Sequence, residues 1–393
     1  MLGLALEGGG AKGAFHMGAV KAFFEEGYQF SGITGTSIGA LNGAIIAQGD
    51  FETGYQIWEN IDNSLLFGLE KSFLDKITQR RIDKETIFYL TTKIKEFIGN
   101  KGIDTSKIKG VIESIIDEEK LRNSPIDFGL VTVSLSDMKP LELFKEDIPQ
   151  GQMMEYLMSS ASLPGFKMER IEGKYFLDGA FYDNCPINLL AGKGYKEIIA
   201  IRTFSFGITQ DIKYPDVKLT TVKPSEDLGG ILNFDSSLIQ RNLLMGYFDA
   251  QRVMKGLKGK KYYIQPVDED FFFHALYKIP DEEIKHLGTL FGLREAPPKR
   301  MLFEKMIPFV ARNLGLNSSA SYQDIIISLF EELAENEEVE KYKIYTLDQF
   351  LTEIRKIPPD RENQKTPRFP TRKLAKTMAA QTILNIFPQL PVK

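Results

Sequence analysis

The sequence contains few of the residues from which cysteine- and histidine-based sites are built. Its 393 residues include one cysteine, Cys185, and three histidines. A single cysteine cannot form an internal disulfide, and so few cysteine and histidine side chains cannot assemble a zinc cluster. We therefore expect neither a metal site nor a cofactor, and the cysteine content suits a reducing compartment.

A surplus of positive charge and a long apolar run are also missing. Lysine and arginine number 49 against 53 aspartates and glutamates, which gives a net charge of −4 and makes nucleic acid an unlikely partner. No stretch of 18 apolar residues occurs, and residues 1–6 lack a basic leader segment. We expect no membrane span and no secretory signal, hence a cytoplasmic protein, with peripheral contact at a membrane surface left open.

Apolar residues and glycines, by contrast, are plentiful. Hydrophobic residues make up 43% of the chain, enough for a substantial core, and no low-complexity tract interrupts them. The chain has 33 glycines, and many of them are crowded into the first 50 residues. Their positions there fall between segments with strand and helix patterns.

Strand and helix patterns alternate through the N-terminal region. A short apolar run at residues 2–6 predicts a buried strand, and residues 14–26 have helical spacing that ends at Gly27. A second strand is expected at about 30–35, followed at once by a helix at 37–47. This order predicts a parallel sheet with helices on its faces. Further strands are expected within residues 128–144, as a pair joined by a tight turn, and at 196–201.

The first glycine motif lies between the first strand and the first helix. Gly8, Gly10 and Gly13 fit the pattern G-x-G-x-x-G. A dinucleotide site would need an acidic residue about 20 positions on, where this chain has threonine, glycine and serine. Lys12 precedes Gly13, so a Walker loop is excluded as well. Three consecutive glycines instead indicate backbone N–H groups that closely approach an anion at a helix N-terminus.

The second motif follows the second strand. Gly35, Ser37 and Gly39 fit G-x-S-x-G, the pattern of a nucleophile elbow, in which a strained serine sits between a strand and a helix. The two glycines would supply the clearance that this turn needs. The alternative is that Ser37 only caps the following helix.

A serine nucleophile needs a base, and the histidines are poor candidates for that role. Ser37, Asp178 and either His274 or His286 have the chain order of an α/β-hydrolase triad, but that fold places several strands before the elbow and this chain has one. His16 follows the glycines directly and is expected to be a packed or surface residue. A carboxylate is the remaining candidate.

Three motifs together resemble those of the patatin-like phospholipases. A glycine triplet with a basic residue before a fourth glycine, an early elbow and an Asp-Gly-Ala turn occur in the family's order. They are Gly8-Gly9-Gly10-Ala11-Lys12-Gly13, Gly35-Thr36-Ser37-Ile38-Gly39 and Asp178-Gly179-Ala180. The segments 159–165 and 183–187 are similar to the family as well, so the resemblance covers about residues 1–205.

The resemblance implies a fold, an activity and a set of site residues. The fold is a three-layer α/β/α sandwich with a mainly parallel central sheet. The activity is hydrolysis of a phospholipid or other acyl-ester lipid through an acyl-enzyme, with Ser37 as nucleophile and Asp178 as base. The oxyanion hole implied by the family motif comprises Gly8, Gly9, Gly10, Lys12 and Gly13. Two alternatives stay open: a non-catalytic lipid- or protein-binding module that retains the fold, and an ordinary Asp-Gly turn at Asp178.

Such a dyad makes a physical demand on Asp178. A carboxylate with a pKa near 4 is a weak base toward a serine hydroxyl, so Asp178 has to be partly desolvated. Its neighbours Phe176, Leu177 and Phe181 are expected to form apolar walls.

The remainder of the chain is expected to be mostly helical. Residues 51–124 have helical, charged patterns around Trp58 and the run Leu65-Leu66-Phe67. We predict a catalytic domain at 1–205 and a helical region at 206–393, with a polar linker near 358–373. The triplet Phe271-Phe272-Phe273 is expected in a core, with membrane contact as the less favoured alternative.

Overall fold

The chain divides into two compact units, Met1–Gln251 and Arg252–Lys393. The computed structural model describes residues 1–61, 106–163, 170–290, 292–293, 296–317, 319–335, 339–356, 380 and 383–385. Outside the described residues lie the run at 65–67, the predicted linker near 358–373 and most of the predicted helical region after residue 356.

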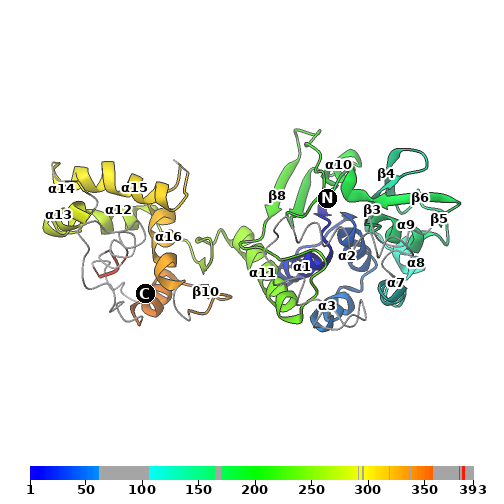
Figure 1. Cartoon of the computed structure of the whole chain (residues 1–393), viewed down its shortest axis with the longest axis horizontal. Coiled ribbons are helices and arrows are strands. Elements are labelled where there is room, and N and C mark those ends of the chain that lie inside the picture. The colour runs from blue at the N-terminus through cyan, green and yellow to red at the C-terminus, as the bar shows by residue number, and fades with distance from the viewer. Residues whose placement is uncertain are drawn as a thin grey trace, which may run out of the picture. The chain divides into compact units, whose positions relative to one another are not determined.

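The first unit is built on a sheet that has eight strands among the described residues (Figure 1). Its order is β5-β6-β3-β2-β1-β7-β8, and β4 pairs with β3. The pairs among β3, β2, β1, β7 and β8 are parallel, whereas β4, β5 and β6 run antiparallel to their neighbours. The strands are β1 Leu2–Leu6, β2 Gly32–Thr36, β3 Asp127–Ser134, β4 Lys139–Phe144, β5 Arg170–Ile171, β6 Lys174–Asp178, β7 Glu197–Ile201 and β8 Lys218–Val222.

Helices cover both faces of this sheet. Gly3 and Gly32 face the side where Leu190 of α10 packs, while the next residue, Ile33, faces Gly43 of α2. Because successive residues of a strand point to opposite faces, α2 and α10 lie on opposite sides. The predicted three-layer, mainly parallel architecture is confirmed. The helices of this unit are α1 Ala14–Glu25, α2 Ile38–Ala47, α3 Phe51–Asn60, α7 Ser106–Glu113, α8 Glu118–Asn123, α9 Met153–Ser160, α10 Ile187–Gly192 and α11 Ser236–Lys255.

The early elements follow the sequence pattern closely. The apolar run at residues 2–6 forms β1, whose residues 3–6 are buried, as the all-apolar pattern of a strand covered on both faces requires. The first helix, the second strand and the helix after the serine motif also form where they were predicted, within one or two residues. The pair expected within residues 128–144 forms as β3 and β4.

The first unit continues beyond the stretch of family resemblance through β8 and α11. β8 extends the sheet by pairing with β7, and α11 packs directly on α1. A Cβ atom at Gly18 would lie 1.9 Å from the Leu243 carbonyl oxygen, and one at Gly246 would lie 2.1 Å from the Phe15 carbonyl oxygen. Small residues on both helices therefore let the two backbones touch.

The second unit is mainly helical and has its own apolar core. Phe272, Phe330 and Phe350 are fully buried there, so the middle of the phenylalanine triplet is core, as predicted, whereas Phe273 is 39% exposed. A parallel two-stranded sheet joins β9 and β10. The elements are β9 Tyr263–Ile264, α12 Glu269–Tyr277, α13 Asp281–Leu290, α14 Pro298–Arg300, the π-helix Met301–Met306, α15 Ile307–Asn313, α16 Tyr322–Ala334, β10 Ile344–Tyr345 and α17 Leu347–Arg355.

Candidate active site

Two strands of the sheet meet end to end at the proposed dyad. β2 runs parallel to β3 and ends with Thr36 opposite Val131, while β6 runs antiparallel and ends with Asp178 opposite Thr132. β4 pairs with the same β3 residues. Since β4 occupies one edge of β3, β2 and β6 share the other. The residue that follows β2, Ser37, is therefore brought to the end of β6.

Ser37 occupies a strained turn between β2 and α2. Its backbone angles are φ 57° and ψ −127°, a region that residues other than glycine rarely adopt. A Cβ atom at Gly35 would lie 2.2 Å from the carbonyl of Gly39, and one at Gly39 would lie 2.3 Å from the Leu6 carbonyl oxygen. The two motif glycines are therefore required by the close approach of three backbone segments.

A second serine, which the sequence reasoning did not single out, supports the turn. The Ser37 N–H donates to Ser160 Oγ at 3.0 Å, and the Ser160 hydroxyl donates to the Val131 carbonyl at 2.7 Å. The Asp178 N–H donates to the Ser162 carbonyl at 2.9 Å. The end of α9 thus holds both members of the pair. In the sequence, this support is indicated only by the run of small residues at 159–165. Residues 164 and 165 of that run lie outside the described part.

Asp178 is a buried carboxyl group beside this serine. It is fully buried, and its Oδ1 accepts a hydrogen bond from the Ala180 N–H at 2.8 Å. Burial raises the pKa of Asp178 to about 6, and the Ala180 amide and the Ser37 hydroxyl partly oppose this rise. Asp178 Oδ2 has no partner of full hydrogen-bond geometry among the described residues. The Ser37 hydroxyl lies close enough to the carboxyl group to lower its pKa, although the two do not form a hydrogen bond of full geometry.

The apolar surroundings expected for Asp178 are only partly closed. Phe176 is buried, whereas Leu177 and Phe181 are half-buried. Because successive residues of a strand point to opposite faces, Phe176 shares the face of β6 on which Asp178 lies, whereas Leu177 does not.

The glycine loop turns sharply in front of α1. Gly9 and Gly10 have positive φ angles of 154° and 55°, and a Cβ atom at Gly10 would lie 2.1 Å from the Ile231 carbonyl oxygen. Within the described residues, the N–H groups of Gly9 and Gly10 donate to no acceptor. Gly8 differs, because its N–H donates to the Asn184 carbonyl at 2.9 Å. All three glycine N–H groups were expected to be available as donors. Within the described residues, those of Gly9 and Gly10 are available, and that of Gly8 is already used.

Lys12 and Gly13 complete the motif, and each makes a contact that fixes the loop. Lys12 Nζ donates to the Thr203 carbonyl at 3.4 Å and so ties the loop to the segment that follows β7. The Gly13 carbonyl accepts from Asn42 Nδ2 at 3.0 Å, and a Cβ atom there would lie 2.6 Å from the Ile38 side chain. Gly13 thus serves the packing of α1 against α2.

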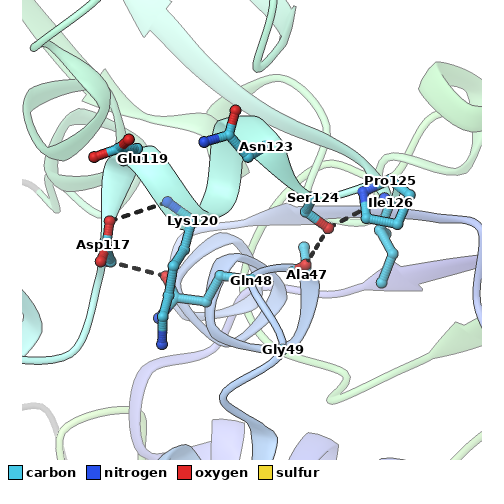
Figure 2. A pocket seen from close by; sticks show the side chains of 10 residues that line it. All are labelled: Ala47, Gln48, Gly49, Asp117, Glu119, Lys120, Asn123, Ser124, Pro125 and Ile126. Atoms are coloured by element: carbon cyan, nitrogen blue, oxygen red, sulfur yellow. Dashed lines mark hydrogen bonds between the residues drawn. The ribbon is translucent and has the colours of Figure 1, made fainter.

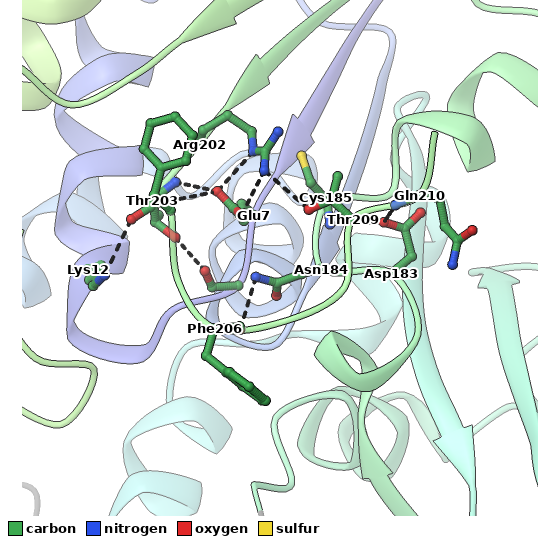
Figure 3. A network of polar contacts seen from close by, with 12 residues as sticks. Glu7, Lys12, Asp183, Asn184, Cys185, Arg202, Thr203, Phe206, Thr209 and Gln210 are labelled. Carbon is green, nitrogen blue, oxygen red and sulfur yellow. Dashed lines mark hydrogen bonds and ion pairs between the residues drawn. The ribbon is translucent and has the colours of Figure 1, made fainter. Parts of the chain in front are cut away.

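An ion pair between the buried Glu7 carboxylate and Arg202 helps to fix the glycine loop (Figure 3). Arg202 donates to both carboxylate oxygens of Glu7, at 3.0 and 3.1 Å, and Glu7 is 1% exposed. The Thr203 N–H also donates to Glu7, and the Thr203 hydroxyl donates to the Gly8 carbonyl at 2.6 Å. Because these residues lie about 195 positions apart, no local pattern in the sequence indicates the pair.

His16 takes no part in this arrangement. His16 is fully buried, its Nδ1 lies 3.3 Å from Asn42 Nδ2, and burial lowers its pKa to about 3, so the ring is neutral. The prediction that His16 is a packed residue is confirmed. His274 and His286 are exposed residues of α12 and α13 in the second unit.

An open cavity of about 570 Å³ lies at the other end of α2 from Ser37 (Figure 2). It is bordered by Gln48, Asp117 and Ser124, whose polar atoms are used in fixing the end of the helix. Gln48 accepts from the Asp117 N–H at 3.1 Å, and the Ser124 hydroxyl donates to the Ala47 carbonyl at 2.6 Å. These side chains hold the helix in place and include no candidate nucleophile with a base. The proposed chemistry belongs to the opposite end of α2.

No helix in the described part of the chain is both long and apolar enough to cross a bilayer. The same residues contain no group of three or more histidine, cysteine, aspartate or glutamate side chains arranged to hold a metal ion.

Comparison with known proteins finds a family that matches part of this chain. Residues 4–191 match the family model described as patatin-like phospholipase. The chain is 27% identical over 312 residues to the patatin-like phospholipase domain-containing protein ZK370.4 of Caenorhabditis elegans, which covers 75% of this chain and 20% of that protein. It is 23% identical over 301 residues to the lysophospholipase NTE1 of Saccharomyces cerevisiae, which covers 74% of this chain and 16% of that protein.

The chain thus spans a fifth or less of the length of these two relatives. Among solved structures, VipD from Legionella pneumophila aligns over 100% of this chain and 93% of its own, with 14% identity and a TM-score of 0.39, a likeness too weak to support an argument. The family match rests on the stretch that carries the glycine loop, the elbow and the Asp-Gly-Ala turn. Residues 4–191, which make up slightly less than half of the chain, thus match the patatin-like phospholipase family.

Proposed function

We propose that this chain is a serine-dependent lipid acyl hydrolase of the phospholipase A or lysophospholipase type. The observation that carries the proposal is the meeting of β2 and β6, which brings the strained Ser37 to the buried carboxyl group of Asp178. A hydroxyl in a strained elbow beside a base of raised pKa is the arrangement that nucleophilic catalysis requires. The names of the relatives support an acyl-ester lipid as the substrate.

The first half of the reaction forms an acyl-enzyme. Ser37 Oγ attacks the carbonyl carbon of the ester while Asp178 accepts the hydroxyl proton. The tetrahedral intermediate collapses, the bond to the alcohol oxygen breaks, and Asp178 returns the proton to the departing alcohol. The acyl group is then esterified to Ser37.

The second half of the reaction releases the acid. Asp178 takes a proton from a water molecule as that water attacks the acyl carbonyl, and Ser37 leaves with the proton restored. With a pKa of about 6, Asp178 is deprotonated at neutral pH and is a better base than an exposed aspartate. One aspartate can therefore serve both halves.

The Gly9 and Gly10 N–H groups are the proposed donors to the oxyanion. They are free among the described residues, and their loop is braced by Ile231 and by the Glu7–Arg202 pair. A donor already in place is worth about 3 kcal/mol of the reaction barrier. We assign Gly8, Lys12 and Gly13 to holding this loop in shape.

Hydrolysis of p-nitrophenyl acyl esters tests the proposal. Ser37→Ala and Asp178→Asn should each abolish hydrolysis, while His274→Asn and His286→Asn serve as matched controls that should retain it. Full activity in Asp178→Asn would show that the dyad is wrong. Absence of activity in folded wild-type protein would favour a non-catalytic lipid- or protein-binding module. Mass spectrometry on a panel of phospholipids, lysophospholipids and triacylglycerols would then define the substrate.

A further inference from the structure

Four large apolar side chains are exposed on two loops of the first unit. Phe204, Phe206 and Ile208 expose 58%, 75% and 54% of their surface, and Leu232 exposes 38%. Single exposed apolar residues are common in folded proteins, but several on two loops that both contact the glycine loop indicate a surface that contacts something apolar. We call these four side chains the apolar rim.

Both loops adjoin the glycine loop of the candidate active site. A Cβ atom at Gly9 would lie 2.7 Å from Ser205 Oγ, and the Ala11 N–H donates to the Ile231 carbonyl at 2.8 Å. The ring of Phe206 packs edge-on against Phe181, three residues beyond Asp178, with 5.8 Å between ring centroids. The apolar rim therefore borders the candidate active site.

The first of these loops is fixed in place, so its aromatic side chains stay at the surface. Glu7 accepts a hydrogen bond from the Phe204 N–H at 3.0 Å, and the Ile208 N–H donates to the Ala180 carbonyl at 2.8 Å. Figure 3 shows the Phe206 side chain projecting away from the Glu7 network. Anchors on both sides of Phe206 prevent the loop from turning its ring into the core.

We propose that the apolar rim docks the first unit onto a lipid surface and so presents the candidate active site to an ester within that surface. This inference rests on the proposed function, because a lipid ester has to be reached where it resides. Arg202, whose guanidinium lies 5.5 Å from the centre of the Phe204 ring, is paired with Glu7. Residues 203–212 and 226–235, which include the two loops, contain no lysine or arginine. Docking is therefore driven by insertion of apolar side chains, and it does not require anionic head groups.

Cosedimentation with phosphatidylcholine vesicles measures the docking directly. The full chain carrying Ser37→Ala is used, so that binding is read without hydrolysis. Adding Phe204→Ser and Phe206→Ser should weaken vesicle binding about tenfold or more, since two inserted rings are lost. The matched control is Tyr28→Ser, which removes a 38% exposed ring from the loop before β2, at the opposite end of the strands.

The active enzyme provides a second readout that separates this proposal from the proposed function. In the wild-type background, the same two substitutions should lower the ratio of vesicle hydrolysis to soluble-ester hydrolysis about tenfold, and Tyr28→Ser should leave that ratio unchanged. Unaltered vesicle binding in the double variant, or binding that needs anionic lipid and disappears with salt, would overturn the docking surface. Failure of wild-type protein to hydrolyse soluble esters would instead count against the proposed function, because cosedimentation does not depend on turnover.

Discussion

Replacing Asp178 with asparagine is expected to abolish hydrolysis and at the same time to relieve a cost in folding. Asparagine has nearly the same shape and keeps an oxygen that can accept from the Ala180 N–H, at 2.8 Å in the wild-type protein. What it removes is a negative charge in a fully buried position. Such a charge is costly unless it is paired, and Asp178 has one firm hydrogen bond and, within the part of the chain that the structure describes, a second oxygen without one.

The magnitude follows from the pKa of Asp178. Burial raises this pKa from 3.8 to about 6, and each unit of difference between the folded and unfolded states corresponds to about 1.4 kcal/mol. Because the folded state holds the proton more tightly, the cost is absent below the unfolded pKa, grows as the pH rises, and is complete above the folded pKa. The ionised side chain therefore destabilises the wild-type fold by about 3 kcal/mol at pH 7.5 and by about 1 kcal/mol at pH 4.5.

Denaturant unfolding of wild-type protein and Asp178→Asn at these two pH values is the assay. The difference in unfolding free energy should change by about 2 kcal/mol between them, in the direction that favours the variant at pH 7.5. Costs of the asparagine amide that do not depend on pH cancel in this comparison. The raised pKa of Asp183, about 6, is common to both proteins and cancels as well. A difference that does not change with pH would refute the claim that Asp178 is a desolvated carboxylate.

Three further predictions concern the base, the elbow and the brace behind the glycine loop. For a soluble ester, kcat/KM should rise through about pH 6 and fall about tenfold per pH unit below it, because only ionised Asp178 accepts the proton; a pH–rate profile checks this. Ser160→Ala leaves the buried Ser37 N–H without its acceptor, so kcat should fall and stability should drop by about 1–3 kcal/mol, whereas Ser159→Ala, measured in parallel, should change kcat little. Glu7→Gln removes the charge paired with Arg202 and should cost about 3 kcal/mol in thermal or denaturant unfolding; an unchanged midpoint would contradict the bracing role.

Local pattern was sufficient to predict the elements that carry the site. The strand at residues 2–6 and the turn at Ser37 are encoded by neighbouring residues, since apolar runs, glycines and helical spacing act over a few positions. Asp178 could be singled out because its Asp-Gly-Ala turn accompanies two other motifs in a fixed order. The histidines could be set aside because an α/β-hydrolase has several strands before the elbow, whereas this chain has one.

The long-range arrangement could not be predicted in the same way. Ser160 supports Ser37 across 123 positions, and Glu7 pairs with Arg202 across 195, so neither partner leaves a periodic signal. The use of the Gly8 N–H by the Asn184 carbonyl depends on how two loops fold against each other. Which glycine amides remain free is therefore a property of tertiary packing and not of the motif.

The central claim is that Ser37 is an activated nucleophile, and labelling with a fluorophosphonate probe tests it most directly. The probe should attach to the wild-type chain, and mass spectrometry of the digested protein should place it on the peptide that contains Ser37. Labelling should be lost in Ser37→Ala and strongly reduced in Asp178→Asn. Absence of labelling in folded wild-type protein, or labelling that persists in Ser37→Ala, would contradict the account.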